Sequence, residues 1–464
     1  MGTIGAPALR FGTDGVRGVA NTELTPELIV ALGRALARVL GVERVLVGRD
    51  TRRSGPLLLA ALVAGLAAEG VSAADVGVLP TPGLAHLSAA TGAPAAMISA
   101  SHNPFADNGI KVFSAGGTKL PTAVEVAIEE EWHRVLGRGP RPPSEAEPGP
   151  GPRVGSITPE PHAVEAYRAH LAGSLGGRRL DGLSVVIDCA HGAAGAVAPA
   201  VLPALGAKVS VLSADPDGTN INDGCGSTHP EALQAAVVAA GADAGLAFDG
   251  DADRCLAVDG EGRVVDGDHM LALFALDLSR RGKLSGGAVA VTVMTNLGFR
   301  LAMAEAGIGV VETPVGDRHV LEAIEAAGLA LGGEQSGHII FRHLATTGDG
   351  ILTGLQLLDL LLRSGQPLSE LAGAAMTRLP QQLASVTLAP GALGRLAASA
   401  AVWAEVAAVE AELGAGGRVL LRESGTEPVV RVMAEAETEE RAAAAVSRLC
   451  AVVGRELGGR PAAS

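Results

Sequence analysis

The chain has 464 residues, 48% of them hydrophobic, and a formal net charge of −14. This length predicts three or four domains at roughly 100–200 residues per domain, and the aromatic content of only 2% predicts cores built from Ala, Val and Leu. The acidic balance, without any Lys/Arg run, argues against a nucleic-acid-binding protein, which needs a basic surface.

The signals of secreted and membrane proteins are missing from the sequence. Its four cysteines lie far apart without a C-x-x-C pair, which argues against a disulfide framework or a zinc site and favours a reducing compartment. The N-terminal stretch lacks the basic and apolar regions of a signal peptide, and no uncharged apolar run reaches the ~18 residues of a membrane span. We therefore expect a cytoplasmic protein that has no membrane partner.

The first part of the chain alternates between strand-like and helical patterns. Residues 10–18, RFGTDGVRG, are rich in glycine and predict a loop that carries Arg17. A helix follows, with Thr25 as its N-cap and Pro26 at its first position. A strand at 45–48 then leads through the segment RDTRRSG into a second helix. This alternation predicts a parallel sheet covered by helices.

The next strand of this region ends in a polar loop. The apolar run 93–97 predicts a short buried strand, and ISASHNPFADNGIK follows at 98–111. A buried parallel strand that ends in a polar loop is where open α/β sheets place their chemistry. Ser101 and His102 form a pair that can present a reactive hydroxyl. Ser, Asn, Pro and Asp are also common turn residues, so a plain turn is an equal alternative for this stretch alone.

A Pro- and Gly-rich stretch at 137–155 predicts an exposed linker, after which the alternation restarts. A strand at 244–248 then runs directly into DGDADR, which places Asp249, Asp251 and Asp253 at alternate positions. In an extended segment, residues two apart point to the same side. Three carboxylates on one side repel one another unless a cation lies between them, and oxygen ligands favour Mg²⁺ or Ca²⁺.

The acidic segment has two other possible interpretations. An EF-hand is excluded, because Arg254 replaces the required Gly and Gly260 stands where the loop needs Glu. A solvated acidic turn is the remaining alternative.

Two further stretches carry polar side chains in tight turns. The segment GEQSGH offers carboxylate, amide and hydroxyl groups that suit sugar hydroxyls, although a plain polar loop is an equal alternative. The segment LRESGTEPVVRVM joins two hydroxyls and two guanidinium groups around a glycine, which suits a phosphate. An ordinary turn with an edge strand is the alternative there. Neither GxGxxG nor GxxxxGK[ST] occurs, so no dinucleotide or P-loop nucleotide site is supported.

Taken together and in this order, the motifs resemble those of the α-D-phosphohexomutase superfamily. They are FGTDGVRG at 11–18, SASHNPFADNGIK at 99–111, DGDADR at 249–254, GEQSGH at 333–338 and RESGTEPVVR at 422–431. The resemblance implies an α/β fold with four domains around a central cleft, three of them similar mixed or parallel α/β domains and the last a smaller α+β domain. The expected boundaries are 1–158 with the phosphoserine loop, 159–257 with the metal loop, 258–374 with the sugar-binding loop and 375–464 with the phosphate-binding loop.

The resemblance also implies roles for individual residues. Ser101 would be phosphorylated in the working enzyme, and one Mg²⁺ per subunit would be held by its phosphate with Asp249, Asp251 and Asp253. The other residues implied at the reaction centre are Arg17, His102, Lys111, Arg254 and His338, with Lys111 or His338 as candidates for proton transfer. The residues implied in substrate binding are Glu334, Gln335, Ser336, Arg422, Ser424, Gly425, Thr426 and Arg431.

The implied reaction is an isomerisation of glucosamine 6-phosphate to glucosamine 1-phosphate through a 1,6-bisphosphate, which feeds UDP-N-acetylglucosamine synthesis. Gln335 and the segment INDGCGSTHP at 221–230 favour the glucosamine branch, since relatives that act on mannose and glucose phosphates commonly have Met at the first of these positions. A phosphomannomutase/phosphoglucomutase is the enzymatic alternative, and a catalytically silent sugar-phosphate binding protein is the other. The expected partner is a small sugar phosphate, and the chain could also form oligomers.

Overall fold

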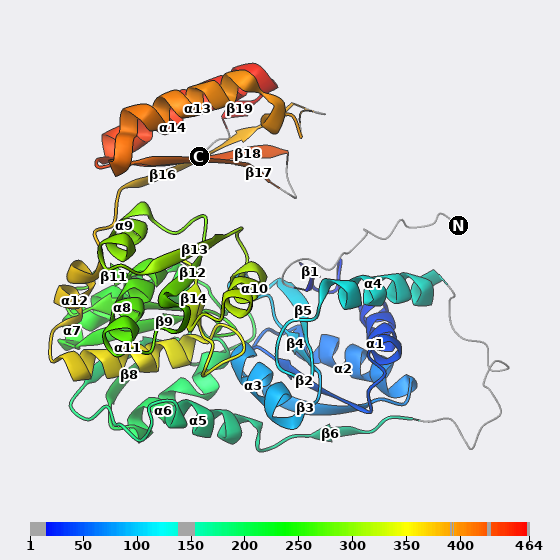
Figure 1. Ribbon diagram of the computed structural model, residues 1–464. Coiled ribbons are helices and arrows are strands. Elements are labelled where there is room, and N and C mark those ends of the chain that lie inside the picture. Colours follow the sequence, from blue (N-terminus) through cyan, green and yellow to red (C-terminus); the bar gives the residue numbers. More distant parts are fainter. Residues whose placement is uncertain (1–14, 138–153, 390–391, 393, 425–427, 462–464) are drawn as a thin grey trace. The chain divides into compact units, whose positions relative to one another are not determined.

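The computed structural model describes residues 15–137, 154–389, 392, 394–424 and 428–461. The chain divides into two compact units. The first comprises Met1–Met294 with Ile308–Gly373, and the second comprises Thr295–Gly307 with Ala374–Ser464. Figure 1 labels the helices and strands of both units.

The first sheet of the first unit has the order β1-β5-β4-β2-β3-β6. The strands β2, β3, β4 and β6 are parallel to one another. At one edge of the sheet, β5 pairs antiparallel with β4, and β1 pairs antiparallel with β5. The strands are β1 (Val16–Val19), β2 (Arg44–Arg49), β3 (Ser72–Val78), β4 (Ala95–Ile98), β5 (Asp107–Phe113) and β6 (Ile157–Pro159).

Helices cover both faces of this sheet (Figure 1). The helices α1 (Pro26–Leu40), α2 (Gly55–Ala68) and α4 (Thr122–Gly137) pack together, and their apolar residues share one core cluster with the sheet. The remaining helix, α3 (Thr81–Thr91), packs against β2 and β4. Because the crossovers β2-α2-β3 and β3-α3-β4 run in opposite directions along the sheet, right-handed connections place α2 and α3 on opposite faces.

The prediction of a loop around Arg17 is wrong for the residues that the structure describes, because Val16–Val19 forms strand β1. Val16 and Arg17 pair with Ile110 and Gly109 of β5. A Cβ atom at Gly109 would come within 2.8 Å of the Val16 carbonyl oxygen. The glycines of this region therefore permit close approach of strands rather than marking a loop.

The second and third sheets repeat the same construction in the first unit. The second has the order β11-β10-β9-β7-β8, in which β7, β8 and β9 are parallel, and the third has the order β13-β12-β14-β15, in which β12, β13 and β14 are parallel. Their strands are β7 (Ser184–Asp188), β8 (Lys208–Leu212), β9 (Ala244–Phe248), β10 (Cys255–Asp259), β11 (Val264–Val265), β12 (Ala288–Thr292), β13 (Gly309–Thr313), β14 (Leu331–Gly333) and β15 (Ile339–Phe341).

Some helices of these two regions begin at a side chain that caps their first turn. For example, α11 has Asp349 as its N-cap, and the Asp349 carboxylate accepts a hydrogen bond from the Leu352 amide. The helices are α5 (Ala163–Gly173), α6 (Ala198–Ala204), α7 (Glu231–Ala240), α8 (Gly267–Arg280), α10 (Asp317–Ala327), α11 (Gly350–Ser364) and α12 (Leu368–Ala375). Among the described residues, no helix has both the length and the apolar composition that a membrane crossing requires.

The second unit has a different architecture. Its sheet has the order β17-β18-β16-β19 and is antiparallel throughout, and α14 packs on it beside α13. The elements are α9 (Leu297–Glu305), β16 (Gln381–Thr387), α13 (Ala400–Leu413), β17 (Arg418–Glu423), β18 (Val429–Glu435), α14 (Glu439–Leu457) and β19 (Arg460–Pro461). The expected fold class, three mixed α/β domains followed by an α+β domain, is confirmed.

The contact between α1 and α2 depends on two glycines. A Cβ atom at Gly33 would lie 2.3 Å from the Leu62 carbonyl oxygen, and one at Gly65 would lie 2.2 Å from the Val30 carbonyl oxygen. Both obstacles are backbone atoms, which cannot move aside as a flexible side chain can. The two helices therefore approach more closely than any residue with a side chain permits.

We predict that Gly65→Ala lowers the Tm, although alanine is the better helix former, because overpacking costs about 1–3 kcal/mol. Gly173→Ala is the matched control, since Gly173 is also helical and a Cβ atom there meets nothing within 4 Å. The control should keep or raise the Tm, as measured by thermal unfolding. A Gly65→Ala protein with the Tm of the unsubstituted chain would contradict the proposed close packing.

Candidate functional site

Three loops of the first unit meet at the carboxyl ends of parallel strands. Residues 99–106 connect β4 to β5, residues 249–254 connect β9 to β10, and residues 334–338 connect β14 to β15. In each case a parallel strand is joined to the antiparallel strand beside it. The Ser101 hydroxyl of the first loop contacts Asp249 of the second, and His338 Nδ1 of the third lies 3.8 Å from Asp253 Oδ2.

The three aspartates of DGDADR converge, each offering a carboxylate oxygen within 4.8 Å of the others. All three are buried, so the alternative of a solvated acidic turn is excluded. The expected reason for their convergence is wrong, because the segment is a turn rather than an extended strand. Ala252 has φ 57°, and its amide donates to the Asp249 carbonyl oxygen at 3.0 Å. This left-handed residue turns the chain so that Asp251 and Asp253 face the same point as Asp249.

Lys111 supplies positive charge to this cluster from the neighbouring strand β5. Its ammonium group lies 2.8 Å from Asp251 Oδ2 and 3.2 Å from Asp253 Oδ2. Burial opposes a low pKa for Asp253, but the charge of Lys111, the hydrogen bond of His338 and the charge of Arg254 outweigh it and hold that pKa well below its usual range. Burial, with the charges of Asp253 and Asp251, raises the pKa of Asp249 well above its usual range. One lysine therefore does not balance three buried carboxylates.

The remaining carboxylate oxygens fit a metal ion. Asp251 Oδ1 and Asp253 Oδ1 are buried without any hydrogen-bond partner. A buried carboxylate oxygen without a partner is costly, and a cation in contact with it removes that cost. An all-oxygen set of this kind suits a hard divalent ion. The cluster could therefore hold a metal, as the sequence predicts.

Ser101 faces this cluster from a strained position. It is buried, has φ 52°, and its hydroxyl donates to Asp249 Oδ2 at 2.5 Å. A left-handed conformation is uncommon for serine and persists only where surrounding contacts enforce it. His102 Nδ1 lies 3.4 Å from the same hydroxyl. Burial, together with the charges of Arg254 and Arg17, lowers the pKa of His102 to about 4, so this imidazole is neutral at pH 7.

The GEQSGH turn places His338 beside the aspartates. Gly348 donates its amide hydrogen to His338 Nε2 at 3.1 Å, so the ring proton lies on Nδ1, which faces Asp253. Glu334 accepts hydrogen bonds from the Gly316 amide at 3.1 Å and from the Ser336 hydroxyl at 3.2 Å. Gln335 is partly buried, and its Nε2 has no hydrogen-bond partner in the structure.

The predicted phosphate-binding residues belong to the second unit. Arg422 of β17 and Arg431 of β18 stand directly opposite each other, an arrangement that is destabilising for like charges. Burial and the charge of Arg431 lower the pKa of Arg422. The Ser424 amide donates to the Val429 carbonyl oxygen at 2.9 Å. This hydrogen bond joins the end of β17 to the start of β18. The predicted residues Gly425 and Thr426 lie outside the described residues. Opposed arginines at a hairpin end suit an anion between them.

Sequence reasoning missed several residues that shape the site. Thr81, which begins α3 after β3, donates its hydroxyl to Asp251 Oδ2 at 2.6 Å and its amide to the Asp251 carbonyl oxygen at 2.9 Å. Asp50 and Arg52 follow β2, and Asn222 belongs to the segment 221–230. For Asp50, Arg52 and Thr81 the available signal was position, because polar residues that follow parallel strands gather at one edge of the sheet.

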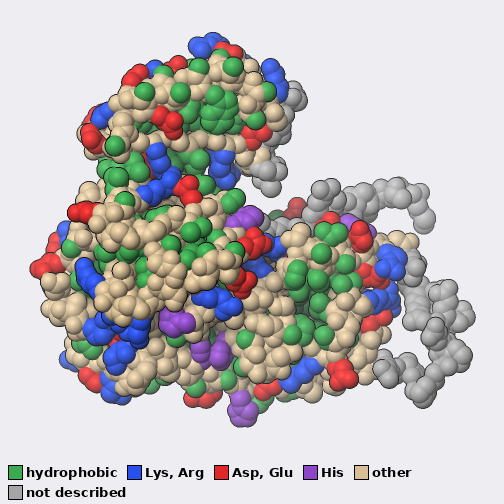
Figure 2. All heavy atoms as spheres, in the orientation of Figure 1, with side chains coloured by type: hydrophobic (Ala, Val, Ile, Leu, Met, Phe, Trp, Pro, Cys, Tyr) green, Lys and Arg blue, Asp and Glu red, His purple; other side chains and the backbone are tan. Residues whose placement is uncertain are grey.

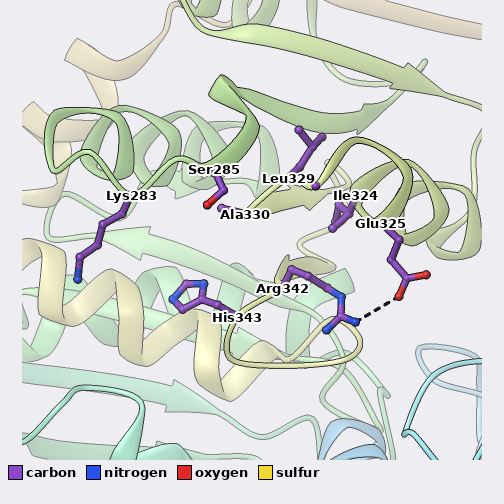
Figure 3. Close-up of a pocket in the computed structure, with 9 residues that line it drawn as sticks. Lys283, Ser285, Ile324, Glu325, Leu329, Ala330, Arg342 and His343 are labelled. Atoms are coloured by element: carbon purple, nitrogen blue, oxygen red, sulfur yellow. Dashed lines mark hydrogen bonds and ion pairs between the residues drawn. The ribbon is translucent and has the colours of Figure 1, made fainter.

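A cavity of about 700 Å³ lies elsewhere in the first unit (Figure 3). Lys283, Arg342 and His343 line it together with apolar side chains, and Arg342 pairs with Glu325 across 3.3 Å. It contains none of the predicted site residues. On the face that Figure 2 shows, Lys and Arg lie in separate groups, with Asp and Glu between and around them.

Comparison with known proteins assigns the chain to a family. Models of the four phosphoglucomutase/phosphomannomutase domains match it: alpha/beta/alpha domain I at residues 8–136, domain II at 165–262, domain III at 266–379 and the C-terminal domain at 383–452. The chain belongs to the phosphoglucomutase/phosphomannomutase family. The expected membership of the wider phosphohexomutase superfamily is thereby confirmed.

Similar proteins extend over the whole length of this family member. A phosphoglucosamine mutase of Frankia alni is 56% identical, with 96% of this chain and 97% of that protein covered. A crystal structure of a phosphoglucomutase/phosphomannomutase family protein from Burkholderia thailandensis has a TM-score of 0.80 at 27% identity and covers 98% of this chain and 99% of its own. An N-acetylphosphoglucosamine mutase of Aspergillus fumigatus, solved with GlcNAc-6P and magnesium, has the same fold. Its TM-score is 0.68 at 19% identity, and the match covers 97% of this chain and 96% of that one.

We predict that Mg²⁺ raises the Tm of the protein and that Asp251→Asn removes most of this shift. An ion that binds only the folded state stabilises it by about 2.7 kcal/mol at 100 times its Kd. Thermal unfolding with EDTA and with MgCl₂ measures the shift without reference to activity. Asp215→Asn is the control, since Asp215 is exposed and outside the cluster. Equal shifts in Asp251→Asn and the control would exclude these aspartates as the metal site.

Proposed function

We propose that the protein is a phosphoglucosamine mutase that interconverts glucosamine 6-phosphate and glucosamine 1-phosphate. The observation that carries the proposal is the Ser101 hydroxyl 2.5 Å from a buried carboxylate cluster, in a chain 56% identical to a phosphoglucosamine mutase. A serine that carries a phosphoryl group needs positive charge around it, and this site has three buried carboxylates able to hold a divalent ion.

The proposed reaction has two half-reactions. In the first, the bond between phosphorus and Ser101 Oγ breaks, a bond between phosphorus and O1 of glucosamine 6-phosphate forms, O1 loses its proton and Ser101 Oγ gains one. The resulting 1,6-bisphosphate turns over. In the second half-reaction the bond between phosphorus and O6 breaks, the phosphoryl group returns to Ser101 Oγ, which loses its proton, and O6 gains one. Each half-reaction is thus balanced in protons, and glucosamine 1-phosphate leaves.

The residues around Ser101 would hold the metal ion, stabilise the transferring group and transfer protons. Asp249, Asp251 and Asp253 would hold one Mg²⁺ with a phosphate oxygen of phosphorylated Ser101, and the bound ion would neutralise part of the phosphate charge. Arg17 and Arg254, whose charges act on His102 in the structure, add positive potential for the transferring group. Neutral His102 can donate or accept a hydrogen bond there. Lys111 and His338 remain the candidates for proton transfer.

Binding of the sugar phosphate would use the other loops. Glu334 and Ser336 offer a carboxylate and a hydroxyl to sugar hydroxyls, while the second unit offers Arg422, Ser424 and Arg431, with Gly425 and Thr426, to the phosphate that is not being transferred. The four cysteines are free and buried, which supports the prediction of a reducing, cytoplasmic location. The product would feed UDP-N-acetylglucosamine synthesis. The formation of oligomers stays a prediction.

We predict that Ser101→Ala abolishes turnover and leaves the fold intact, because the site then lacks the oxygen that carries the phosphoryl group. Steady-state assays measure turnover, and intact mass measures whether a single phosphoryl group is present on the unsubstituted protein and missing from the variant. Ser336→Ala is a useful comparison, because it removes a hydroxyl from the sugar-binding turn and should keep the phosphoryl group. Near-normal activity of Ser101→Ala would refute the phosphoserine mechanism.

The substrate preference is predicted to depend on Gln335. Its buried Nε2 lacks a partner, and a substrate acceptor would satisfy it, whereas methionine offers no donor. We expect a higher kcat/KM for glucosamine 6-phosphate than for glucose 6-phosphate, and a smaller ratio in Gln335→Met. Parallel assays with mannose 6-phosphate test the alternative branch. A protein that prefers glucose or mannose phosphate would overturn the glucosamine assignment and leave the phosphomutase chemistry standing.

A further inference from the structure

Arg52 is a fully buried arginine whose five N–H groups all have partners. Its Nε donates to Asp50 Oδ2 at 2.9 Å. The other four N–H groups point at backbone carbonyl oxygens of the loop that carries Ser101. Nη2 donates to Ser101 at 2.9 Å and to Asn103 at 2.8 Å, and Nη1 donates to Asp107 at 3.1 Å and to Pro104. A guanidinium group has five donors in a fixed plane, so Asp50 and these four carbonyl groups together use its full capacity.

Asp50 extends this network to the other side of Ser101. Its Oδ2 also accepts a hydrogen bond from the Ser99 hydroxyl at 2.7 Å, and the Ser99 Oγ in turn accepts one from the Ser101 amide at 2.9 Å. The Asp50 side chain is fully buried. The C=O of Ser101 is therefore bound by Arg52 of the buried ion pair, and its N–H is bound by Ser99, which Asp50 of the same pair holds in turn.

Asn222 fixes the same carbonyl groups from the second sheet region. Its Nδ2 donates to the carbonyl oxygens of Ser101 at 2.9 Å and Asn103 at 3.1 Å. It also lies against the metal loop, since a Cβ atom at Gly250 would come within 2.6 Å of the Ser101 carbonyl oxygen and 2.9 Å of Asn222 Nδ2. Asn222 thus connects the segment INDGCGSTHP, to which the proposed function gives no role, to the loop of the reactive serine.

We infer that Arg52 and Asn222 are positioning residues that hold Ser101 in its left-handed conformation, with its Oγ directed at the aspartate cluster. The inference rests on the proposed function, because transfer through Ser101 is the step that it affects. Without these donors, the backbone at Ser101 would relax toward the ordinary regions of φ, and Oγ would leave Asp249. A displacement of ~1 Å at a reacting atom costs about 10²-fold in rate.

Arginine is required by this arrangement for a geometric reason. Lysine would keep the positive charge, but it has three donors on one nitrogen and cannot reach the four carbonyl groups and Asp50 together. The carbonyl oxygens and the Asp50 carboxylate together compensate the buried guanidinium. Arg52→Lys would leave several of these acceptors unsatisfied, and it tests folding as well as positioning. Asn222 is therefore the better first target.

Asn222 is well suited to conservative substitution. Its φ of 59° is tolerated by aspartate and by glycine. Asn222→Asp keeps the shape but places a carboxylate oxygen against two carbonyl oxygens, whereas Asn222→Gly removes the side chain, and the donor with it, without adding a charge. We therefore expect the aspartate variant to be the more damaged of the two. Asn220→Asp is the matched control, because Asn220 lies two residues before Asn222 and donates to the Asp215 carbonyl oxygen rather than to the serine loop.

The experiment measures three quantities on the full chain with Mg²⁺ present: kcat and KM for glucosamine 6-phosphate, phosphoryl transfer from glucosamine 1,6-bisphosphate to Ser101 by intact mass, and hydrogen exchange in peptides that span 99–108. For Asn222→Asp we expect kcat and the transfer rate to fall about tenfold or more, with KM changed less than about threefold. Exchange in 99–108 should be faster, while the Tm and the rest of the exchange pattern stay close to those of Asn220→Asp.

The outcomes separate the inference from the function on which it rests. If the unsubstituted protein takes no phosphoryl group on Ser101, the proposed function fails, and the exchange data still test whether Asn222 holds the loop. Unchanged kcat and exchange in both Asn222 variants would overturn the inference. Loss of activity in step with a loss of folded protein would also overturn it, because that is a purely structural effect. Arg52→Lys, where it folds, should repeat the loss in kcat.

Discussion

The site is organised by the repulsion between three buried carboxylates. Asp249, Asp251 and Asp253 bring carboxylate oxygens within 4.8 Å of one another, and Lys111 is the ammonium group that contacts two of them. Buried like charges are unstable without compensation, so the surroundings must supply donors and cations. Thr81, the Ser101 hydroxyl and the Arg254 amide provide donors, and Asp251 Oδ1 and Asp253 Oδ1, which lack a hydrogen-bond partner, are available to an ion. The loops around the cluster can be understood as contributors to this balance.

One kind of connection recurs in the fold and brings residues that are distant in the sequence to one point. In each of the first three sheets, the candidate loop is the connection between a parallel strand and the antiparallel strand next to it. Such a loop begins at the carboxyl edge of the sheet, where helix-flanked strands leave space. The strand before the loop and the strand after it pair with each other, so both ends of the loop are anchored. In the second unit, the loop between β17 and β18 is likewise a connection between paired strands. Loops anchored at both ends can hold strained residues such as Ser101 and Ala252.

Much of this could be predicted from sequence, for reasons that particular residues make clear. Thr25 and Pro26 marked the start of α1, and apolar runs bounded by turn residues located β4 and β9. The aspartate cluster followed from residue type, although the geometric reason given for it was wrong because Ala252 is left-handed. The strand at Arg17 was missed, since glycine signals a loop as readily as a close strand contact. Arg52 was missed because most of its partners are carbonyl groups, which every residue has and no sequence pattern reveals.

The strained residues of the site are held by hydrogen bonds that cross from one sheet region to another. Asn222 of the second region binds the carbonyl group of Ser101 in the first, and Thr81 of the first binds the carbonyl group of Asp251 in the second. The Gly350 amide of the third region donates to the carbonyl oxygen of Ala252 at 2.9 Å. No one region could keep these conformations alone, because strain persists only where external contacts outweigh it. The geometry of the candidate site is therefore a property of the three assembled regions, and folding of each region by itself would not create it.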